Sequence, residues 1–152
     1  MKGLYYEEFK IGMTFEHALT RTVTEMDNVL FTALTHNPQP LHLDHEFAAA
    51  NSEFKKPLVN SIFTLGLVIG VSVGDTTLGT TVGNLGMSDT KFPKPVFYGD
   101  TIRSTTEIVG MRESKSRPDV GIVDFLHRGY NQRGEIVCEC KRQGMMKKKP
   151  KA

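Results

Sequence analysis

Residues 57–74 limit the folds open to this chain more than any other segment. They read Pro-Leu-Val-Asn-Ser-Ile-Phe-Thr-Leu-Gly-Leu-Val-Ile-Gly-Val-Ser-Val-Gly, so apolar residues fall on every face of a helix. The β-branched content favours a strand, whereas the length favours a helix of about fourteen residues, which would span roughly 21 Å. We expect a helix that is buried all round. It should begin at Asn60 or Ser61 and end just before Gly74.

After this segment the chain has the pattern of an antiparallel meander. Residues 76–87 are rich in Thr, Val and Gly, and later segments alternate apolar and polar residues. The sequence Asn-Gln-Arg-Gly at 131–134 is a strong hairpin signal. Strands are expected at 15–23, 76–87, 101–111, 120–130 and 135–145. The pattern predicts an α+β fold in which a curled antiparallel sheet wraps one buried helix.

Two shorter helices are expected between the first strand and the buried helix. Thr24 can cap the first, with Asp27 as the carboxylate three residues on. Asp44 can cap the second, which should end near Asn51. The apolar residues of the first helix recur with helical period at Met26, Val29, Leu30, Ala33 and Leu34.

Length and composition indicate one domain. The chain has 152 residues, of which 39% are hydrophobic and 24% charged. We expect a single domain over 1–152, with a core at about 7–146 and a basic tail at 147–152. The net charge of +2 gives no argument for nucleic acid, and no apolar run approaches the roughly 18 residues of a membrane span.

The N-terminus lacks the apolar region of a signal peptide. Cys138 and Cys140 lie two residues apart on an expected strand, where neighbours seldom form a disulfide. These features predict a protein of the reduced cytoplasm, with the two thiols serving strand packing.

Three of the five histidines lie in the loop between the two short helices, within residues 34–50. Two prolines precede His42, so regular structure is not expected there. His42 is the candidate base, because an imidazole with an ordinary pKa near ~6.5 exchanges protons at neutral pH. His36 and His45 are expected at helix ends with structural roles. The spacing of the three matches no common ligand pattern, so no metal is expected.

The loop and the layout around it resemble the MaoC-like dehydratases, the (R)-specific enoyl-CoA hydratase group. That family carries a Gly-Asp-x-Asn-Pro-(Leu/Ile)-His segment before a small-residue helix, and a later Pro-Val-x-x-Gly-Asp element. The matching segments here are Pro40-Leu41-His42, Val59 to Leu67, Pro95-Val96 and Gly99-Asp100. The resemblance implies a hotdog fold and a lyase that adds water to an enoyl-CoA thioester or removes it. It implies no cofactor, since the CoA thioester is the substrate.

Three positions depart from the family pattern. Asn37, five residues before His42, stands where the family has its catalytic Asp, and Gln39 stands at its Asn. Ser61 replaces a glycine whose backbone N–H the family uses as an oxyanion donor. The variant motif, with the later Ser-Lys-Ser-Arg-Pro, is similar to a branch associated with mesaconyl-CoA and related dicarboxylyl thioesters. Gln39 is kept as a substrate-positioning candidate.

His42 and Asn37 are therefore the catalytic candidates. The N-terminus of the central helix, at Asn60 and Ser61, offers N–H groups and a positive dipole end to the thioester oxygen. Asn37 can hold a water but cannot take or return a proton. Three interpretations stay open: His42 performs all proton transfer, a nearby acid such as Asp44 substitutes, or the site binds without catalysis.

Phosphates of CoA need cationic partners. Lys115 and Arg117 in a polar turn are the candidates, with Lys91 and Lys94 as weaker ones. Apolar walls for the pantetheine arm are expected from the central helix and from Phe92, Val96 and Phe97. Because hotdog proteins pair their sheets, the resemblance implies a homodimer or higher homo-oligomer with the site at the interface.

Two other functions are considered. A hotdog acyl-CoA thioesterase would want a carboxylate on the central helix, and residues 57–74 contain none. A non-catalytic acyl-CoA-binding or assembly subunit is suggested by Asn37.

Overall fold

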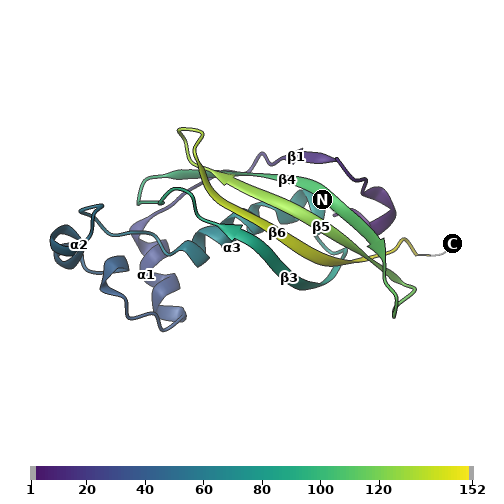
Figure 1. Cartoon of the computed structure of the whole chain (residues 1–152), viewed down its shortest axis with the longest axis horizontal. Coiled ribbons are helices and arrows are strands. Elements are labelled where there is room, and N and C mark those ends of the chain that lie inside the picture. Colours follow the sequence, from purple (N-terminus) through teal and green to yellow (C-terminus); the bar gives the residue numbers. More distant parts are fainter. Residues whose placement is uncertain (1–2, 151–152) are drawn as a thin grey trace.

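The computed structural model describes residues 3–150, in which an antiparallel sheet packs over one long helix. The strands are β1 (Thr14–Glu16), β2 (Arg21–Thr22), β3 (Thr81–Lys91), β4 (Thr101–Glu113), β5 (Val120–Tyr130) and β6 (Ile136–Lys147). Their order is β1-β4-β5-β6-β3, and β2 also pairs with β4. The helices are α1 (Glu25–Leu34), α2 (His45–Asn51) and α3 (Ser61–Thr76). α3 lies along the sheet, and α1 and α2 form a lobe at one end of it (Figure 1).

The predicted α+β layout is confirmed, with differences at the ends of elements. The strand expected at 15–23 is interrupted, because the chain between β1 and β2 carries the buried His17, whose ring bonds Asp75 and Thr106. α3 begins as expected at Ser61, after the cap residue Asn60. It continues past the predicted end to Thr76, so β3 begins later than expected.

α3 is not buried all round. Its buried residues are Thr64, Leu65, Val68, Val71, Ser72 and Thr76. On another face the side chain of Ile62 is 56% exposed, and a Cβ placed on Gly66 or Gly70 would meet no atom within 4 Å. One side of the central helix is therefore open in the single chain.

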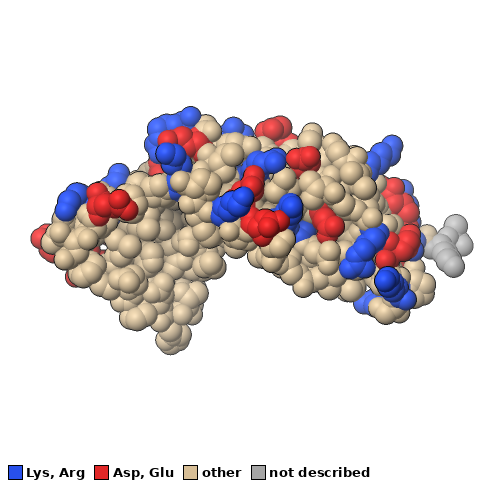
Figure 2. Space-filling view, in the orientation of Figure 1, with Lys and Arg blue, Asp and Glu red and all other residues tan. Residues whose placement is uncertain are grey.

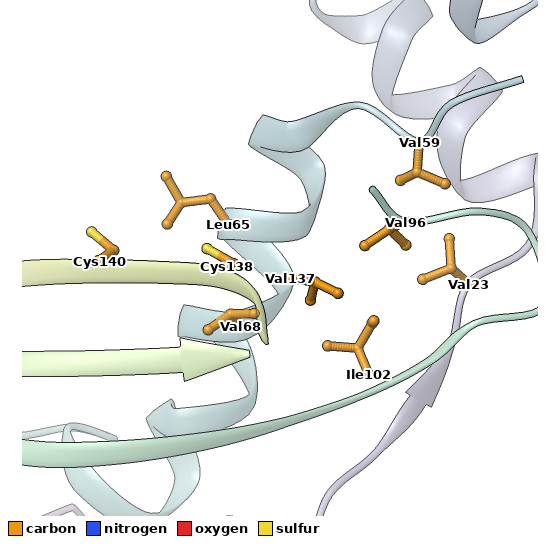
Figure 3. Close-up of a cluster of buried hydrophobic side chains, with 9 residues drawn as sticks. All are labelled: Val23, Val59, Leu65, Val68, Val96, Ile102, Val137, Cys138 and Cys140. Atoms are coloured by element: carbon orange, nitrogen blue, oxygen red, sulfur yellow. The ribbon is translucent and has the colours of Figure 1, made fainter. Parts of the chain in front are cut away.

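Two hydrophobic clusters hold the sheet to the rest of the chain. The first packs the N-terminal half of α3 against β4 and β6 and consists of Val23, Val59, Leu65, Val68, Val96, Ile102, Val137, Cys138 and Cys140 (Figure 3). The second, under the far end of the sheet, consists of Phe9, Ile108, Val123, Phe125 and Met146. The first cluster fixes the position of α3's N-terminus relative to the sheet.

α1 turns its polar residues inward. Thr24 caps it in a capping box with Asp27, as predicted. Its two buried residues are Asn28 and Thr32, whereas its apolar residues other than the half-buried Phe31 are exposed, including Met26 at 75% and Leu34 at 72%. An amphipathic helix ordinarily shows the reverse. Figure 2 shows that the lower part of this lobe carries no charged residue on the face in view, while charges of both signs cover the sheet.

Within residues 3–150, none of the helices combines the length and the apolar character needed to cross a membrane.

Candidate active site

The loop after α1 is built from turns that the sequence specifies locally. The side-chain Oδ1 of Asn37 accepts a hydrogen bond from the N–H of Gln39 at 3.0 Å, which is an Asx turn. Gln39 then caps the short 3-10 turn η2 (Pro40–His42), and Asp44 caps α2 through the N–H of Phe47. Pro40 suits the first position of such a turn, because its missing N–H has no partner to lose there. These turns bring His42 back toward the start of α3.

The ring of His42 is oriented by a backbone carbonyl. Its Nδ1 lies 2.7 Å from the oxygen of Leu58. A carbonyl oxygen only accepts hydrogen bonds, so Nδ1 carries the proton and, in the neutral ring, Nε2 keeps a free lone pair. The N–H of Leu58 also donates to the oxygen of Leu41 at 3.1 Å, and this hydrogen bond holds Leu58 beside the loop. This arrangement leaves the lone pair of Nε2 free to accept a proton or a hydrogen bond.

The N-terminus of α3 offers one of the two backbone donors that the sequence suggested. The N–H of Asn60 donates to Oδ1 of Asn28 at 2.8 Å, so it is not available to a substrate oxygen. The side chain of Asn60 accepts from the N–H of Ile62 and caps the helix. Among residues 3–150 the N–H of Ser61 has no hydrogen-bond partner, and the positive end of the helix dipole lies there. The prediction that the Asn60 N–H is an oxyanion donor is therefore wrong, and the Ser61 N–H stays the predicted donor.

A cavity of about 350 Å³ brings these groups together. It is lined by Phe31, Thr35, Asn37, His42, Asn60, Ser61 and Ile62. Four of the predicted site residues thus share one cavity, and no carboxylate lines it within the described part of the chain. Gln39 and Asp44 lie outside the lining, because both side chains cap helical turns. Asp44 is therefore not placed to replace the family's acid.

A second cavity of about 270 Å³ also reaches Ser61. Its walls are mostly apolar and consist of Phe54, Leu58, Val59, Ser61, Thr64, Phe92, Pro93, Lys94, Pro95, Val96 and Val137. Phe92 and Val96 were expected as such walls. The ring of Phe97 instead packs against Phe54, and Nζ of Lys56 lies 4.0 Å from its centroid. Lys94 is the cation that this cavity contains.

Lys115 and Arg117 lie far from both cavities within one chain. They belong to the turn between β4 and β5, which Figure 1 shows at the opposite end of the sheet from α1 and α2. The side chain of Arg117 is bonded to Asp119, at 2.6 Å in the shortest contact. The sequence prediction that this turn binds CoA therefore has no support from the single chain, because the polar turn follows the far end of β4.

The other two loop histidines lie at helix ends, as predicted. His45 begins α2 and its Nε2 lies 2.7 Å from a carboxylate oxygen of Glu25. His36 follows the last residues of α1 in a left-handed conformation with φ of 54° and is exposed. Neither lines the cavity of His42.

Two residues of the site were missed from the sequence. Asn28 is fully buried under the loop and bonds the backbone of three segments around the site, and the hydroxyl of Tyr98 donates to the oxygen of His42 at 3.1 Å. A signal for Asn28 existed: Asn28, Thr32 and Thr35 recur with helical spacing. Asn28 and Thr32 are buried in the structure, and Thr35, just after the end of α1, lines the cavity of His42.

A chain of polar side chains, buried except at Asp75, runs beneath the other end of α3. It links Asp75, His17, Thr106, His127 and Arg142 through contacts of 2.7, 2.8, 2.9 and 3.0 Å in that order. An arginine only donates, so Nε2 of His127 must accept and its Nδ1–H must donate onward to Thr106. Burial, together with the positive charge of Arg142, lowers the pKa of His127 to about 3.

The two cysteines are free and buried, as expected for packing groups. Burial raises the pKa of the Cys138 thiol to about 12, so this thiol is not reactive.

These residues define a domain whose motif loop and central helix N-terminus share one cavity, and the comparisons identify its family. A model of the MaoC-like domain family matches residues 8–128, and the chain belongs to that family. It is 35% identical over 150 residues to the mesaconyl-CoA hydratase of Cereibacter sphaeroides, covering 99% of this chain and 43% of the relative. It is 36% identical over 107 residues to the (R)-specific enoyl-CoA hydratase of Aeromonas caviae, covering 70% of this chain and 74% of the relative.

Solved structures agree on the fold. The monoamine oxidase regulatory protein of Archaeoglobus fulgius superposes with a TM-score of 0.86 at 32% identity, covering 99% of this chain and 98% of that one. A Mycobacterium tuberculosis protein described as a double hotdog fold gives a TM-score of 0.87 at 23% identity, covering 99% of this chain and 46% of that one. The fold is thus a hotdog. The chain spans less than half the length of the mesaconyl-CoA hydratase that it matches.

Proposed function

We propose that the protein is an enoyl-CoA hydratase or dehydratase, a lyase acting across the 2,3-double bond of an acyl-CoA thioester. One observation carries the proposal. The carbonyl of Leu58, 2.7 Å from Nδ1 of His42, leaves Nε2 as a base in the same cavity as the unpaired N–H of Ser61. A base and an oxyanion donor in one cavity are what addition of water to an unsaturated thioester requires.

In the hydration direction, a water held by Nε2 of His42 and the side-chain amide of Asn37 attacks C3 of the thioester. The water's proton passes to Nε2 as the new C–O bond forms. The electron pair of the double bond moves onto the thioester oxygen, where the N–H of Ser61 and the helix dipole stabilise the enolate. The imidazolium then returns its proton to C2, so that one water is added overall.

Of the three interpretations of the Asn37 substitution, we favour the one in which His42 performs all proton transfer. No carboxylate of residues 3–150 lines the cavity, and Asp44 is held as a helix cap. The Nδ2 group of Asn37 keeps hydrogen-bonding capacity for a water, because its Oδ1 is the atom engaged by Gln39.

The second cavity suits the apolar part of the substrate, and Ser61 lines both this cavity and the cavity of His42. Lys94 in its wall and Lys56 nearby are the cations that we assign to CoA phosphates, in place of Lys115 and Arg117. The similarity to a mesaconyl-CoA hydratase, which covers 99% of this chain, supports a short branched dicarboxylyl thioester as substrate. A cytoplasmic location fits such a metabolite.

We further propose that a second copy completes the molecule. β3 ends the strand order, so one of its edges is unpaired within the described part of the chain, and its apolar Val82, Leu85 and Met87 are more than 40% exposed. The open face of α3 and the exposed apolar face of α1 need covering as well. The longer relative and the double hotdog support this arrangement, since each has room for two domains where this chain has one.

A thioesterase is less well supported. α3 is longer than predicted and therefore includes one acidic residue, Asp75. Its carboxylate is bonded to His17, away from the cavity.

The deciding assay incubates the protein with crotonyl-CoA and with mesaconyl-CoA. Loss of the enoyl absorbance without free thiol is expected. Release of thiol would replace the hydratase with a thioesterase, and binding of CoA thioesters with neither signal would leave the non-catalytic subunit.

A further inference from the structure

Asn28 of α1 is a polar residue with no exposed surface, and it lines neither cavity. A buried amide is costly unless its hydrogen bonds are made. Those of Asn28 are made, and each goes to a part of the candidate site.

The amide bonds three backbone groups. Its Nδ2 donates to the oxygen of His42 at 2.9 Å and to the oxygen of Leu58 at 3.1 Å. Its Oδ1 accepts from the N–H of Asn60 at 2.8 Å. Carbonyl oxygens only accept and a backbone N–H only donates, so the amide can take one orientation alone.

These three groups control the two chemical elements of the site. The oxygen of Leu58 is also the acceptor for Nδ1 of His42, so Asn28 holds both the backbone of the base and the carbonyl that orients its ring. Asn60 is the cap of α3 and directly precedes Ser61, the oxyanion donor. Segments that lie 14 to 32 residues from Asn28 in the sequence are thus tied at one side chain.

We propose that Asn28 is a positioning residue for the reaction. It fixes the position of Nε2 of His42 relative to the N–H of Ser61. This inference rests on the proposed function. Because Asn28 does not reach the substrate cavities, its loss acts on kcat and leaves KM nearly unchanged. A displacement of reacting groups by about 1 Å costs on the order of 10²-fold in rate.

The first test compares Asn28→Leu with Thr32→Val. Thr32 is equally buried one turn along the same helix, and its hydroxyl has no hydrogen-bond partner among residues 3–150. For Asn28→Leu we expect kcat to fall roughly 10- to 100-fold with KM within about twofold. Thr32→Val should retain wild-type kinetics. Equal kinetics for the two variants would overturn the proposal.

The second test uses Asn28→Asp and decides the question even where the leucine variant does not fold. The carboxyl group can still accept from the N–H of Asn60, but it donates to a carbonyl only when protonated. The ratio of its kcat to that of the wild type should therefore rise as pH falls from about 8 to about 6. A ratio independent of pH would contradict a positioning role.

A readout without turnover separates this inference from the proposed function. Long-range ¹H–¹⁵N NMR spectra of His42 should show the Nδ1–H tautomer in the wild type and a mixture of tautomers in the Asn28 variants. An inactive wild type would overturn the hydratase while this measurement still tested Asn28. An unchanged tautomer in a folded Asn28 variant would overturn the inference itself.

Discussion

Arg142 donates a hydrogen bond from Nε to Nε2 of His127 at 3.0 Å; both side chains are buried, and within residues 3–150 Nη2 of Arg142 has no hydrogen-bond partner. The imidazole must therefore stay neutral, because a proton on Nε2 would set two donors against each other. This relationship explains why burial and Arg142 lower the pKa of His127 to about 3.

The first prediction is a loss of stability in acid. A histidine that titrates near 6.5 when unfolded and near 3 when folded binds more protons in the unfolded state between these values. Its contribution is present above about pH 6.5 and is lost as pH falls toward 3, with an upper bound of about 5 kcal/mol. Urea unfolding at a series of pH values measures this slope. The double variant His127→Phe/Arg142→Leu should flatten it, whereas His45→Gln, an exposed control, should not.

The second prediction concerns the base. His42→Ala should lower kcat by roughly 10²- to 10⁴-fold, because general-base catalysis is lost. The variant should keep its oligomeric state and near-UV circular dichroism. His36→Ala changes an exposed loop histidine outside the cavity and serves as the control. Near-wild-type turnover by the His42 variant would show that another group takes the proton.

The third prediction restores a carboxylate at the position where the family has one. Asn37→Asp should retain or raise kcat, since the oxygen that accepts from the N–H of Gln39 is kept and a second proton-transfer group is added. Steady-state kinetics with crotonyl-CoA measure the effect. Complete loss of activity would mean that the amide N–H groups of Asn37 are used specifically.

The fourth prediction distinguishes two sets of cations. Lys94→Met should raise KM for CoA thioesters several-fold, on the order of the 1 kcal/mol of a partly exposed ion pair, and should weaken the salt dependence of KM. Lys115→Met should leave KM unchanged. A raised KM for Lys115→Met alone would return the CoA phosphates to the turn between β4 and β5, supplied by another subunit.

The fifth prediction tests the assembly. Leu85→Lys/Met87→Lys on β3 should shift the protein to monomers in sedimentation velocity. Charged side chains oppose the pairing of edge strands, because they would lose their hydration in the interface. The matched control is Ile11→Lys, at a side chain 66% exposed next to Gly12, which bonds β4, and β5 and β6 lie between β4 and β3. A wild type that sediments as a monomer would remove the proposed second copy.

The helices and later strands could be predicted because their signals are local. Thr24 with Asp27 and Asp44 before α2 mark helix starts by side-chain chemistry alone. The end of α3 could not be predicted in this way. Two contacts hold the last residues in the helix. The hydroxyl of Thr76 donates to the oxygen of Ser72, and Asp75 pairs with His17, which lies 58 residues earlier in the sequence.

The same distinction between local and long-range interactions applies to the site. His42, Asn37 and Ser61, which line one cavity, could be proposed from the sequence because their motif is contiguous or resembles a family pattern. The engagement of the Asn60 N–H was not foreseen, since it depends on Asn28, 32 residues earlier. The distance of Lys115 from the cavities was likewise not predictable, because the direction in which β4 runs is set by tertiary packing.

Ser61 belongs to both cavities, and this has a consequence for engineering. A bulkier residue there would narrow the cavity that we assign to the acyl group and at the same time crowd the backbone N–H on which the proposed reaction depends. Selectivity and turnover are therefore coupled at this position. A change of acyl preference that spares the rate has to be sought at Phe92 or Val96, which line the second cavity but not the cavity of His42.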